Sequence, residues 1–433
     1  MPTILDGSTQ LSPTRIRLAI LALAVGAFGI GTTEFVAMGL LPNIATDLLP
    51  ELAARSQEQA NAQAAWLITA YALGVVVGAP TIAALVARYR RKTVLLWLGV
   101  AFTVGTLASA LLPSFGLVLL ARFVAALPHG AYFGMAALVA ASLMGPGKRG
   151  KGVALVMTGL TIANVIGVPF ATWVGQEFGW RSAYLIVTGI FALATVTIWF
   201  AVPVQAGNPQ QTMRRELRVF RRSQVWFVLG FGSIGFGGLF AVYSYLAPLA
   251  TEVAGESASL VPWALATMGA GMTIGNLVGG HLADRGVKRA LIVFFSLMIV
   301  VLTALALTAS WTPTMFLFVF AVGFASQGLG PAIQTRLMDV AGDSQSLAAA
   351  LNHSALNIGN ALGAFLGGVV IAGGLGYLAP VWTGVVLTGV GLAIVITSFR
   401  VERRQLGREL ARANDAEDRR VADRNPPTAP IPV

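Results

Sequence analysis

The sequence predicts an all-α, polytopic membrane protein with twelve transmembrane helices in two pseudo-symmetric six-helix halves. Hydrophobic residues make up 56% of the 433 residues and charged residues only 11%, whereas soluble domains carry about 25% charged residues. Apolar stretches of about 20 residues, long enough to cross about 30 Å of hydrocarbon, recur along the chain. This composition excludes an ordinary soluble enzyme and a disordered regulator. The absence of cysteine excludes a disulfide-stapled secreted domain.

Six apolar stretches form each predicted half, and most connections between them are short. In the first half they cover roughly 16–41, 63–86, 93–112, 115–143, 152–174 and 181–203. In the second half they cover roughly 225–249, 260–282, 290–310, 313–335, 346–372 and 377–399. The first stretch follows Arg15 and Arg17 as the core of a signal peptide would, but it continues to Leu41 and eleven more follow it. We therefore expect a retained helix.

Polar segments divide the chain into five parts. These are a cytoplasmic N-terminus at 1–15, an N-terminal half at 16–203, a cytoplasmic central linker at 204–224, a C-terminal half at 225–399 and a cytoplasmic tail at 400–433. The linker is basic, so contact with anionic lipid is the alternative to a solvated connection. The tail alternates charges and ends in a proline-rich run, which predicts a frayed helix and then a largely disordered segment.

The Lys and Arg residues predict the orientation of the helices. All 29 of them, apart from Arg55, Arg122 and Arg181, fall on one side of the predicted spans. Because basic loops remain in the cytoplasm, both termini are predicted to be cytoplasmic. The net charge of +11 therefore reflects membrane topology, and no nucleic-acid partner is expected.

Short polar motifs of the first half recur in the second half at a nearly constant distance. The matched positions are Gly159 and Ala355, Arg88 and Arg285, and His129 and Gln327, which lie 196, 197 and 198 residues apart. Independent matches at one spacing indicate an internal parallel repeat. Repeats of this kind place a solute site at the interface of the two halves near the membrane midplane, so this pattern predicts transport.

Glu34 and Arg122 are the acid and the base that lie well inside predicted spans. A charge in hydrocarbon costs at least about 2.5–3.5 kcal/mol, so such residues normally face a cavity or a partner. Their positions put both about 10 Å below the outer surface, at a depth where an ion pair can form. We predict that Glu34 carries a proton and that Arg122 tunes its proton affinity. A static buried pair that fixes two helices is the alternative.

Two histidines are also intramembrane. His129 lies about halfway across the fourth stretch and His353 near the inner end of the eleventh. Histidine titrates near neutrality, so a proton relay is one role, and a hydrogen-bonded packing histidine is the commoner one. No two intramembrane acids or histidines have helical spacing, so no metal site is expected. Two G-x-G-x-x-G matches lie outside any strand-to-helix context, which argues against nucleotide binding.

Other polar side chains in apolar helices are candidates for a substrate cavity. Amides there can bind a solute, or they can stabilise helix packing by about 0.6–2 kcal/mol. Tyrosines can line a cavity or pack between helices. His353, Asn357 and Asn360 are spaced four and three residues apart and share one face of the eleventh helix. The candidates are Tyr71, Asn164, Tyr243, Gln327, Asn357 and Asn360.

A loop motif between the eighth and ninth stretches runs from Gly280 to Arg289 and reads GHLADRGVKR. It resembles the signature G-x-L-A-D-R-x-x-x-R of the major facilitator superfamily, whose acid and bases latch helix ends on the cytoplasmic side. A degenerate first copy has Ala87 in place of the acid. The residues to which the resemblance assigns this gating role are Asp284, Arg285, Arg289 and Arg88.

Three further stretches resemble the twelve-helix drug:proton antiporter branch of that family. Glu34 and the residues up to Leu48 fit the helix 1 signature, and the stretch from Arg122 to Gly130 resembles a helix 4 motif implicated in proton transfer. A helix 5 motif follows, with Ala163-Asn164 in place of the usual Gly-Pro. Its matched residues are Gly159, Ala163, Gly167 and Pro169. Local similarity to bacterial arabinose/sugar-efflux and chloramphenicol-exporter transporters narrows the resemblance.

Together these features predict a secondary active transporter that exports a small organic solute, drug-like or sugar-like, in exchange for protons by alternating access. The alternatives are a proton-independent facilitator or importer and, more remotely, a non-transporting receptor. No enzymatic constellation is visible. The proton gradient is the expected energy source, and no cofactor is expected. We expect a monomer in the bacterial inner membrane, with the solute, protons and the lipid bilayer as partners.

Overall fold

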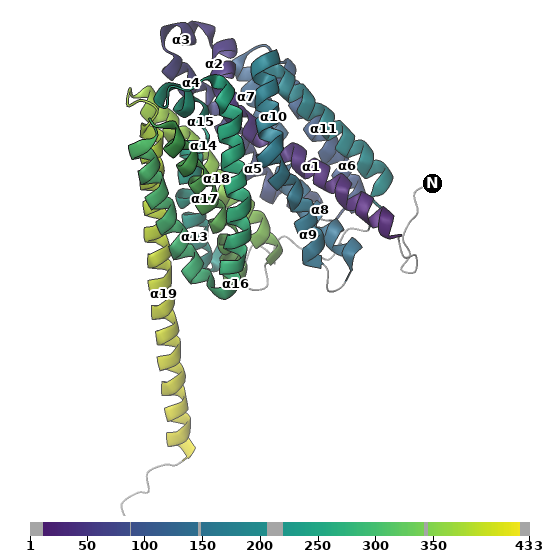
Figure 1. The fold of residues 1–433 in the computed structure, drawn as a ribbon. Coiled ribbons are helices and arrows are strands. Elements are labelled where there is room, and N and C mark those ends of the chain that lie inside the picture. Colours follow the sequence, from purple (N-terminus) through teal and green to yellow (C-terminus); the bar gives the residue numbers. More distant parts are fainter. Residues whose placement is uncertain (1–11, 87, 146–148, 206–219, 342–344, 425–433) are drawn as a thin grey trace, which may run out of the picture.

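A computed structural model of the chain describes residues 12–86, 88–145, 149–205, 220–341 and 345–424 (Figure 1). Within these residues, 11 helical stretches are long and apolar enough to cross a membrane. The all-α membrane fold predicted from the sequence is confirmed. The N-terminal residues 1–11, most of the central linker (206–219) and the last residues of the tail (425–433) lie outside the described part.

The first half contains six spans and a short helical connection between the first two. Its elements are α1 (Pro13–Gly39), α2 (Leu41–Leu48), α3 (Pro50–Arg55), α4 (Gln57–Ala64), α5 (Trp66–Val86), α6 (Arg91–Leu111), α7 (Phe115–Ala126), α8 (His129–Met144), α9 (Arg149–Ile162), η1 (Ala163–Gly167), α10 (Val168–Phe178) and α11 (Trp180–Ala201). The fourth span comprises α7 and α8, which are separated at Leu127 and Pro128 because proline cannot donate a backbone hydrogen bond. The fifth comprises α9, the π-helical turn η1 and α10.

The second half begins after the central linker. Its elements are α13 (Ser223–Gly230), η3 (Phe231–Gly235), α14 (Gly237–Tyr243), α15 (Leu246–Pro248), η4 (Leu249–Val253), η5 (Ala258–Leu260), α16 (Val261–Thr308), α17 (Thr312–Ala341), α18 (Gln345–Ala372) and α19 (Ala379–Arg424). Two predicted spans lie within α16, on either side of Gly286, whose φ of 168° and ψ of 99° are not helical. This is why 11 stretches correspond to twelve predicted spans.

The tail begins as a helix, as the predicted frayed helix would, and its last residues lie outside the described part. Helix α19 continues past the predicted end of the last span and stops only at Arg424, and Figure 1 shows it extending beyond the other helices. Residues 400–424 are rich in Ala, Glu and Arg, which are strong helix formers.

The two halves meet at one end of the molecule and diverge toward the other. Figure 1 shows them in contact near α4, α10 and α15 and separated toward the lower end. At the closed end, the amide of Asn61 donates a 2.8 Å hydrogen bond to the hydroxyl of Tyr377, and Gln176 donates to the Ala258 carbonyl at 3.0 Å. The lower end carries the Arg- and Lys-rich connections, and we call it the basic end.

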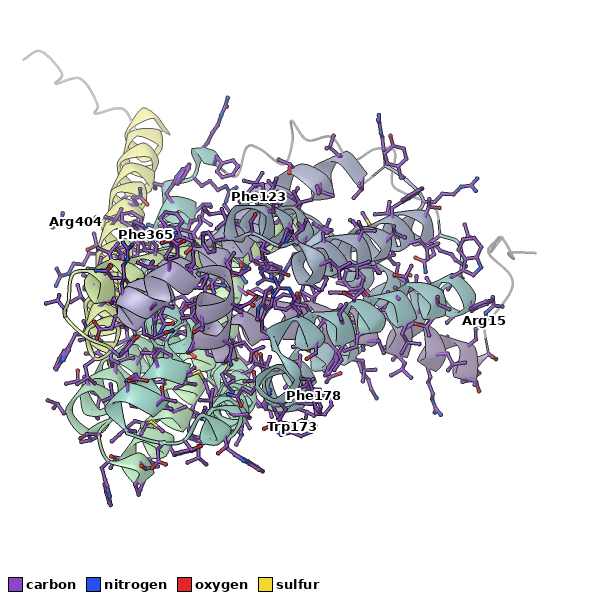
Figure 2. The ribbon with its side chains drawn as sticks, turned by 90° about the horizontal axis from the view of Figure 1, so that it is seen from above. Arg15, Phe123, Trp173, Phe178, Phe365 and Arg404 are labelled. Atoms are coloured by element: carbon purple, nitrogen blue, oxygen red, sulfur yellow. The ribbon has the colours of Figure 1, made fainter. Side chains whose placement is uncertain are left out.

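Large apolar side chains cover the outside of the helix bundle. Trp173 and Phe178 project from the periphery in the view from above (Figure 2) and are 47% and 71% exposed. Exposed rings of this size suit a surface in contact with lipid and not with water. The polar groups described below lie inside the bundle.

Candidate functional site

A buried hydrogen bond joins the two halves. Glu34 on α1 and Asn360 on α18 are 6% and 1% exposed, and Nδ2 of Asn360 donates to Oε1 of Glu34 at 3.3 Å. Glu34 lies in the buried and mostly apolar part of α1. This part of the helix packs closely against its neighbours, because Gly31 and Gly39 leave no room there for a Cβ. The acid predicted from the first half therefore has its partner in the second half.

Arg122 on α7 is almost completely buried and lies beside Glu34 in the first half. Its Nη1 atom donates to the backbone carbonyl of Thr33 at 2.9 Å and to the Thr33 hydroxyl at 3.3 Å. The guanidinium carbon lies 4.2 Å from the ring centroid of Tyr71 and 5.5 Å from that of Tyr184. Within the part of the chain that the structure describes, its Nε and Nη2 atoms have no hydrogen-bond acceptor. Cation–π contacts thus hold this charge in place.

Glu34 and Arg122 form no direct ion pair in the described part of the chain. Arg122 donates to Thr33, the residue that precedes Glu34 in the chain, while Glu34 accepts from Asn360. The two predicted charges are therefore neighbours at similar depth. The carboxylate is bonded to the other half, and the guanidinium to its own half.

A line of titratable side chains leads from Arg122 toward the basic end. The Tyr71 hydroxyl lies 3.3 Å from Nδ1 of His129. The His129 ring centroid is 6.3 Å from that of His353 on α18. Phe133 stacks on His353 at 5.4 Å and lies 5.2 Å from His129. Both intramembrane histidines therefore meet where α8 faces α18.

The predicted cavity residues separate into two groups. Tyr71, Tyr243 and Asn360 surround Glu34: both tyrosines are close enough to interact with it electrostatically, and Tyr243 stacks on Phe35 at 5.2 Å. These side chains come from both halves. The Tyr243 hydroxyl is buried and has no hydrogen-bond partner among the described residues.

The other three candidates lie apart from Glu34. Asn357 uses its amide to donate to the backbone carbonyl of His353 at 3.0 Å. Gln327 on α17 is half-buried. Asn164 is buried in η1 with its side-chain oxygen unpartnered, and its backbone carbonyl faces Gly269 of α16 so closely that a Cβ at Gly269 would lie 2.2 Å from it.

The helix 5 motif packs α9, η1 and α10 against α1. A Cβ at Gly159 would lie 2.1 Å from the Ala24 carbonyl, and one at Gly167 would lie 2.6 Å from the Thr32 hydroxyl. Ala163 is buried in the same interface, where a Cβ at Gly31 would lie 2.9 Å from the Ala163 Cβ, and Pro169 is also buried. Small residues at these positions permit the close approach of two helices.

The predicted gating residues Asp284, Arg285, Arg289 and Arg88 are all exposed at the basic end. In the described residues none of them forms an ion pair. The ion pairs at this end instead join Glu402 of α19 to Lys288 of α16 at 2.6 Å and to the buried Arg336 of α17 at 3.0 Å.

Sequence reasoning did not identify Tyr184, Thr33 or Glu402 as parts of these networks. Tyr184 is a lone hydroxyl-bearing ring in an apolar span, which is a weak signal for a partner of Arg122. Glu402 was assigned to the tail, and only the continued helix brings it against α16 and α17.

Comparison with known proteins agrees with this architecture. The family model of the Major Facilitator Superfamily matches residues 23–272 and 248–430. The inner membrane transport protein YdhP of Escherichia coli is 38% identical over 386 residues, which cover 89% of this chain and 97% of YdhP. A chloramphenicol resistance protein of Streptomyces lividans is 31% identical over 381 residues, covering 87% and 95% of the two chains.

A solved structure with the same fold is that of a bacterial homologue of the human lysosomal transporter Spinster, in an inward-facing and unoccupied conformation. It has a TM-score of 0.69 and 18% identity, and it covers 90% of this chain and 98% of that chain. The helices, the matched family model and the relatives agree that this is a multi-pass inner membrane transport protein and not an enzyme. The chain belongs to the Major Facilitator Superfamily.

Proposed function

We propose that this protein exports a small organic solute in exchange for protons, with Glu34 as the proton-carrying group. The observation that carries the proposal is the buried hydrogen bond from Asn360 of one half to Glu34 of the other. A contact that spans the moving interface depends on the arrangement of the halves. Protonation of Glu34 and the conformation of the protein are therefore coupled.

The coupling follows from the energetics of a buried carboxylate. When the halves separate at the closed end, Glu34 loses its donor and becomes accessible to water, from which it takes up a proton. When they close, the neutral acid enters the apolar interior more readily than the charged one would. Release toward the basic end then proceeds along Tyr71, His129 and His353, the titratable groups that lie in that direction.

We place the basic end in the cytoplasm, with both termini there, by the positive-inside rule. The arrangement in Figure 1 is then open toward the cytoplasm. The solute is assigned to the interface of the halves, where it contacts Tyr71, Tyr243 and Asn360 first. Gln327, Asn164 and Asn357 are further candidates from both halves. Two rings, one amide and one neutralisable acid suit a neutral or amphipathic solute better than a polyanion.

The test uses everted membrane vesicles with a pH-sensitive dye and a panel of chloramphenicol, lipophilic cations, pentoses and nucleosides. Wild type is compared with Glu34→Gln and with the control Glu51→Gln, which alters an exposed acid of α3. We expect solute-dependent proton movement in wild type and in the control, and none in Glu34→Gln. Equal signals in all three would remove Glu34 from the mechanism. Solute flux without proton movement would favour a proton-independent facilitator.

A further inference from the structure

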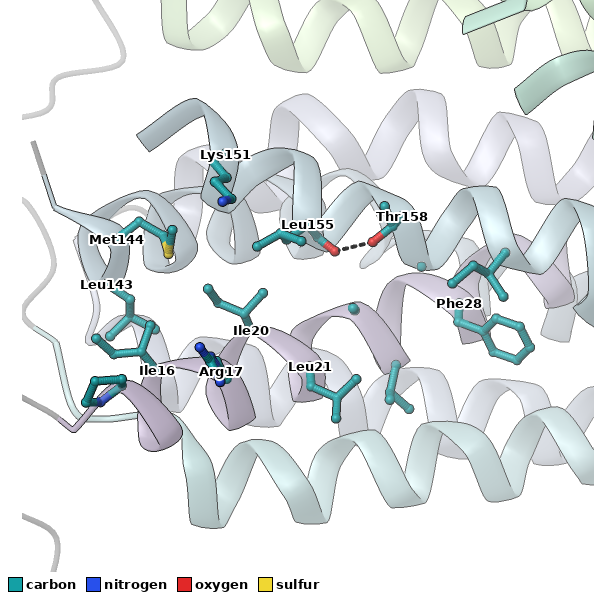
Figure 3. A pocket seen from close by; sticks show the side chains of 15 residues that line it. Ile16, Arg17, Ile20, Leu21, Phe28, Leu143, Met144, Lys151, Leu155 and Thr158 are labelled. Atoms are coloured by element: carbon teal, nitrogen blue, oxygen red, sulfur yellow. Dashed lines mark hydrogen bonds between the residues drawn. The ribbon is translucent and has the colours of Figure 1, made fainter. Parts of the chain in front are cut away.

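A groove of about 820 Å³ runs between α1 and α9 in the half of the bundle near the basic end (Figure 3). Its walls are mostly aliphatic, with Ile20, Leu21 and Leu155 among the lining side chains. Leu21 and Leu155 are 59% and 39% exposed, so no described segment of the chain covers them. The groove plays no part in the site around Glu34.

The groove faces away from the second half. Ile162 lines it and is exposed, whereas Asn164 is buried with its backbone against Gly269 of α16. Two residues correspond to about half a turn of helix, so the two positions lie on nearly opposite sides. The groove therefore opens toward the bilayer and not toward the interface where a solute would move.

Two cations stand at the mouth of the groove. Arg17 of α1 and Lys151 of α9 project into it from opposite walls (Figure 3). Neither makes an ion pair or a side-chain hydrogen bond with a described residue, and no Asp or Glu lines the groove. Two positive charges thus flank the open end of an apolar channel that has no acidic partner of its own.

We propose that this groove binds a phospholipid with an anionic headgroup from the cytoplasmic leaflet. The phosphate lies between Arg17 and Lys151, and one acyl chain follows the aliphatic walls past Leu21 and Leu155. Charge complementarity identifies the headgroup, because basic pockets between transmembrane helices on the cytoplasmic side attract anionic lipids. The length and apolar lining of the groove identify the acyl chain. The leaflet follows from the orientation proposed above.

The test measures lipid binding to the detergent-purified full chain by native mass spectrometry, with phosphatidylglycerol and phosphatidylcholine as the two probes. The double variant Arg17→Gln/Lys151→Gln is compared with Arg403→Gln/Arg404→Gln, which removes two exposed cations of α19. We expect wild type to prefer phosphatidylglycerol. The first double variant should weaken its binding by roughly 30-fold, because each cation near an anionic surface contributes a factor of about five.

The control variant should bind phosphatidylglycerol as wild type does, which would separate a defined site from general basic charge. A third variant, Leu21→Trp, fills the groove and keeps both cations, and it too should lose the lipid. Equal binding by wild type and the first double variant would overturn the proposal. So would displacement of phosphatidylglycerol by an equal concentration of glycerol 3-phosphate, because the groove would then recognise a free anion. Neither readout depends on proton exchange by Glu34.

Discussion

The hydroxyl of Tyr71 lies 3.3 Å from Nδ1 of His129, so one buried ring connects the second and fourth spans. The face of the same ring lies 4.2 Å from the Arg122 guanidinium. Tyr71 is therefore the link between the charged pair near the closed end and the histidines toward the basic end. The hydroxyl of Tyr71 contacts His129, and its ring contacts Arg122. A substitution that removes only the hydroxyl therefore separates the two contacts.

Tyr71→Phe should slow proton exchange by about 10-fold or more, since it removes a hydroxyl from the relay and keeps the ring beneath Arg122. The free energy of unfolding should fall by only about 1 kcal/mol, the contribution of one hydrogen bond. The matched control is Tyr132→Phe, which removes a hydroxyl that donates to the Leu23 carbonyl at 3.0 Å. Stopped-flow dye measurements in vesicles report the rates. Equal rates in the two variants would exclude Tyr71 from the proton path.

Gly269→Ala should prevent the two halves from closing fully, because its Cβ would lie 2.2 Å from the Asn164 carbonyl, a backbone atom that has little room to shift. Spin labels on the closed ends of α10 and α16 should report a longer distance than in wild type. Gly280→Ala, in the same helix with nothing within 4 Å of its Cβ, should leave the distance unchanged. An unchanged distance in Gly269→Ala would show that the contact is not tight.

Glu402→Gln should destabilise the second half by about 1–3 kcal/mol, because it leaves the buried Arg336 without its carboxylate. The bond to Lys288 contributes little of this, since the Lys288 side chain is 55% exposed. Chemical denaturation in detergent measures the effect. Glu51→Gln, which alters an unpaired exposed acid, serves as the reference, and a loss no larger than in that variant would contradict the assignment.

Asp47 should make the stability depend on pH in the acid range. Burial alone would raise its pKa, but hydrogen bonds from Arg181 and from Trp180, the latter at 2.9 Å, outweigh burial and hold the pKa below its ordinary value. A lowered folded-state pKa stabilises above the unfolded-state value, about 3.9, and this stabilisation is lost as the pH falls through the folded-state value.

Asp47→Asn should therefore cost less than about 1 kcal/mol at pH 7, because both side chains of the pair are partly exposed. The difference from wild type should persist at pH 5 and shrink below about pH 4. Thermal unfolding in detergent across this range measures it. A difference that grows on acidification would mean that Asp47 is better stabilised in its protonated form.

The sequence was sufficient for the fold, because twelve apolar stretches and one repeat spacing leave few arrangements of a chain this long. It was also sufficient to select Glu34, Arg122 and His129, since a polar group in an apolar span is conspicuous without a structure. What it could not supply was pairing across large separations. Glu34 and Asn360 are 326 residues apart in the sequence, and no periodic signal connects them. The contact depends on how the two halves dock.

Local conformation was equally inaccessible to sequence reasoning. The π-helical turn at Ala163–Gly167 depends on a backbone choice that hydrophobic periodicity does not encode. The continuation of α19 to Arg424, in contrast, agrees with the helix propensity of its Ala, Glu and Arg residues. The proton-coupling, cavity and gating roles of the site residues remain predictions. The packing described above agrees with these roles but does not test them.

The buried positive charge of Arg122 affects how the protein responds to the membrane potential. A guanidinium keeps its proton in proteins, so its charge is constant through the cycle. With Glu34 ionised, the two groups sum to zero; with Glu34 protonated, they sum to one positive charge buried in the membrane. A potential of 100 mV, negative inside, acts on such a charge with up to about 2.3 kcal/mol. If the protein exchanges protons as proposed, the electric field would drive the proton-loaded state inward and leave the unloaded state free to return.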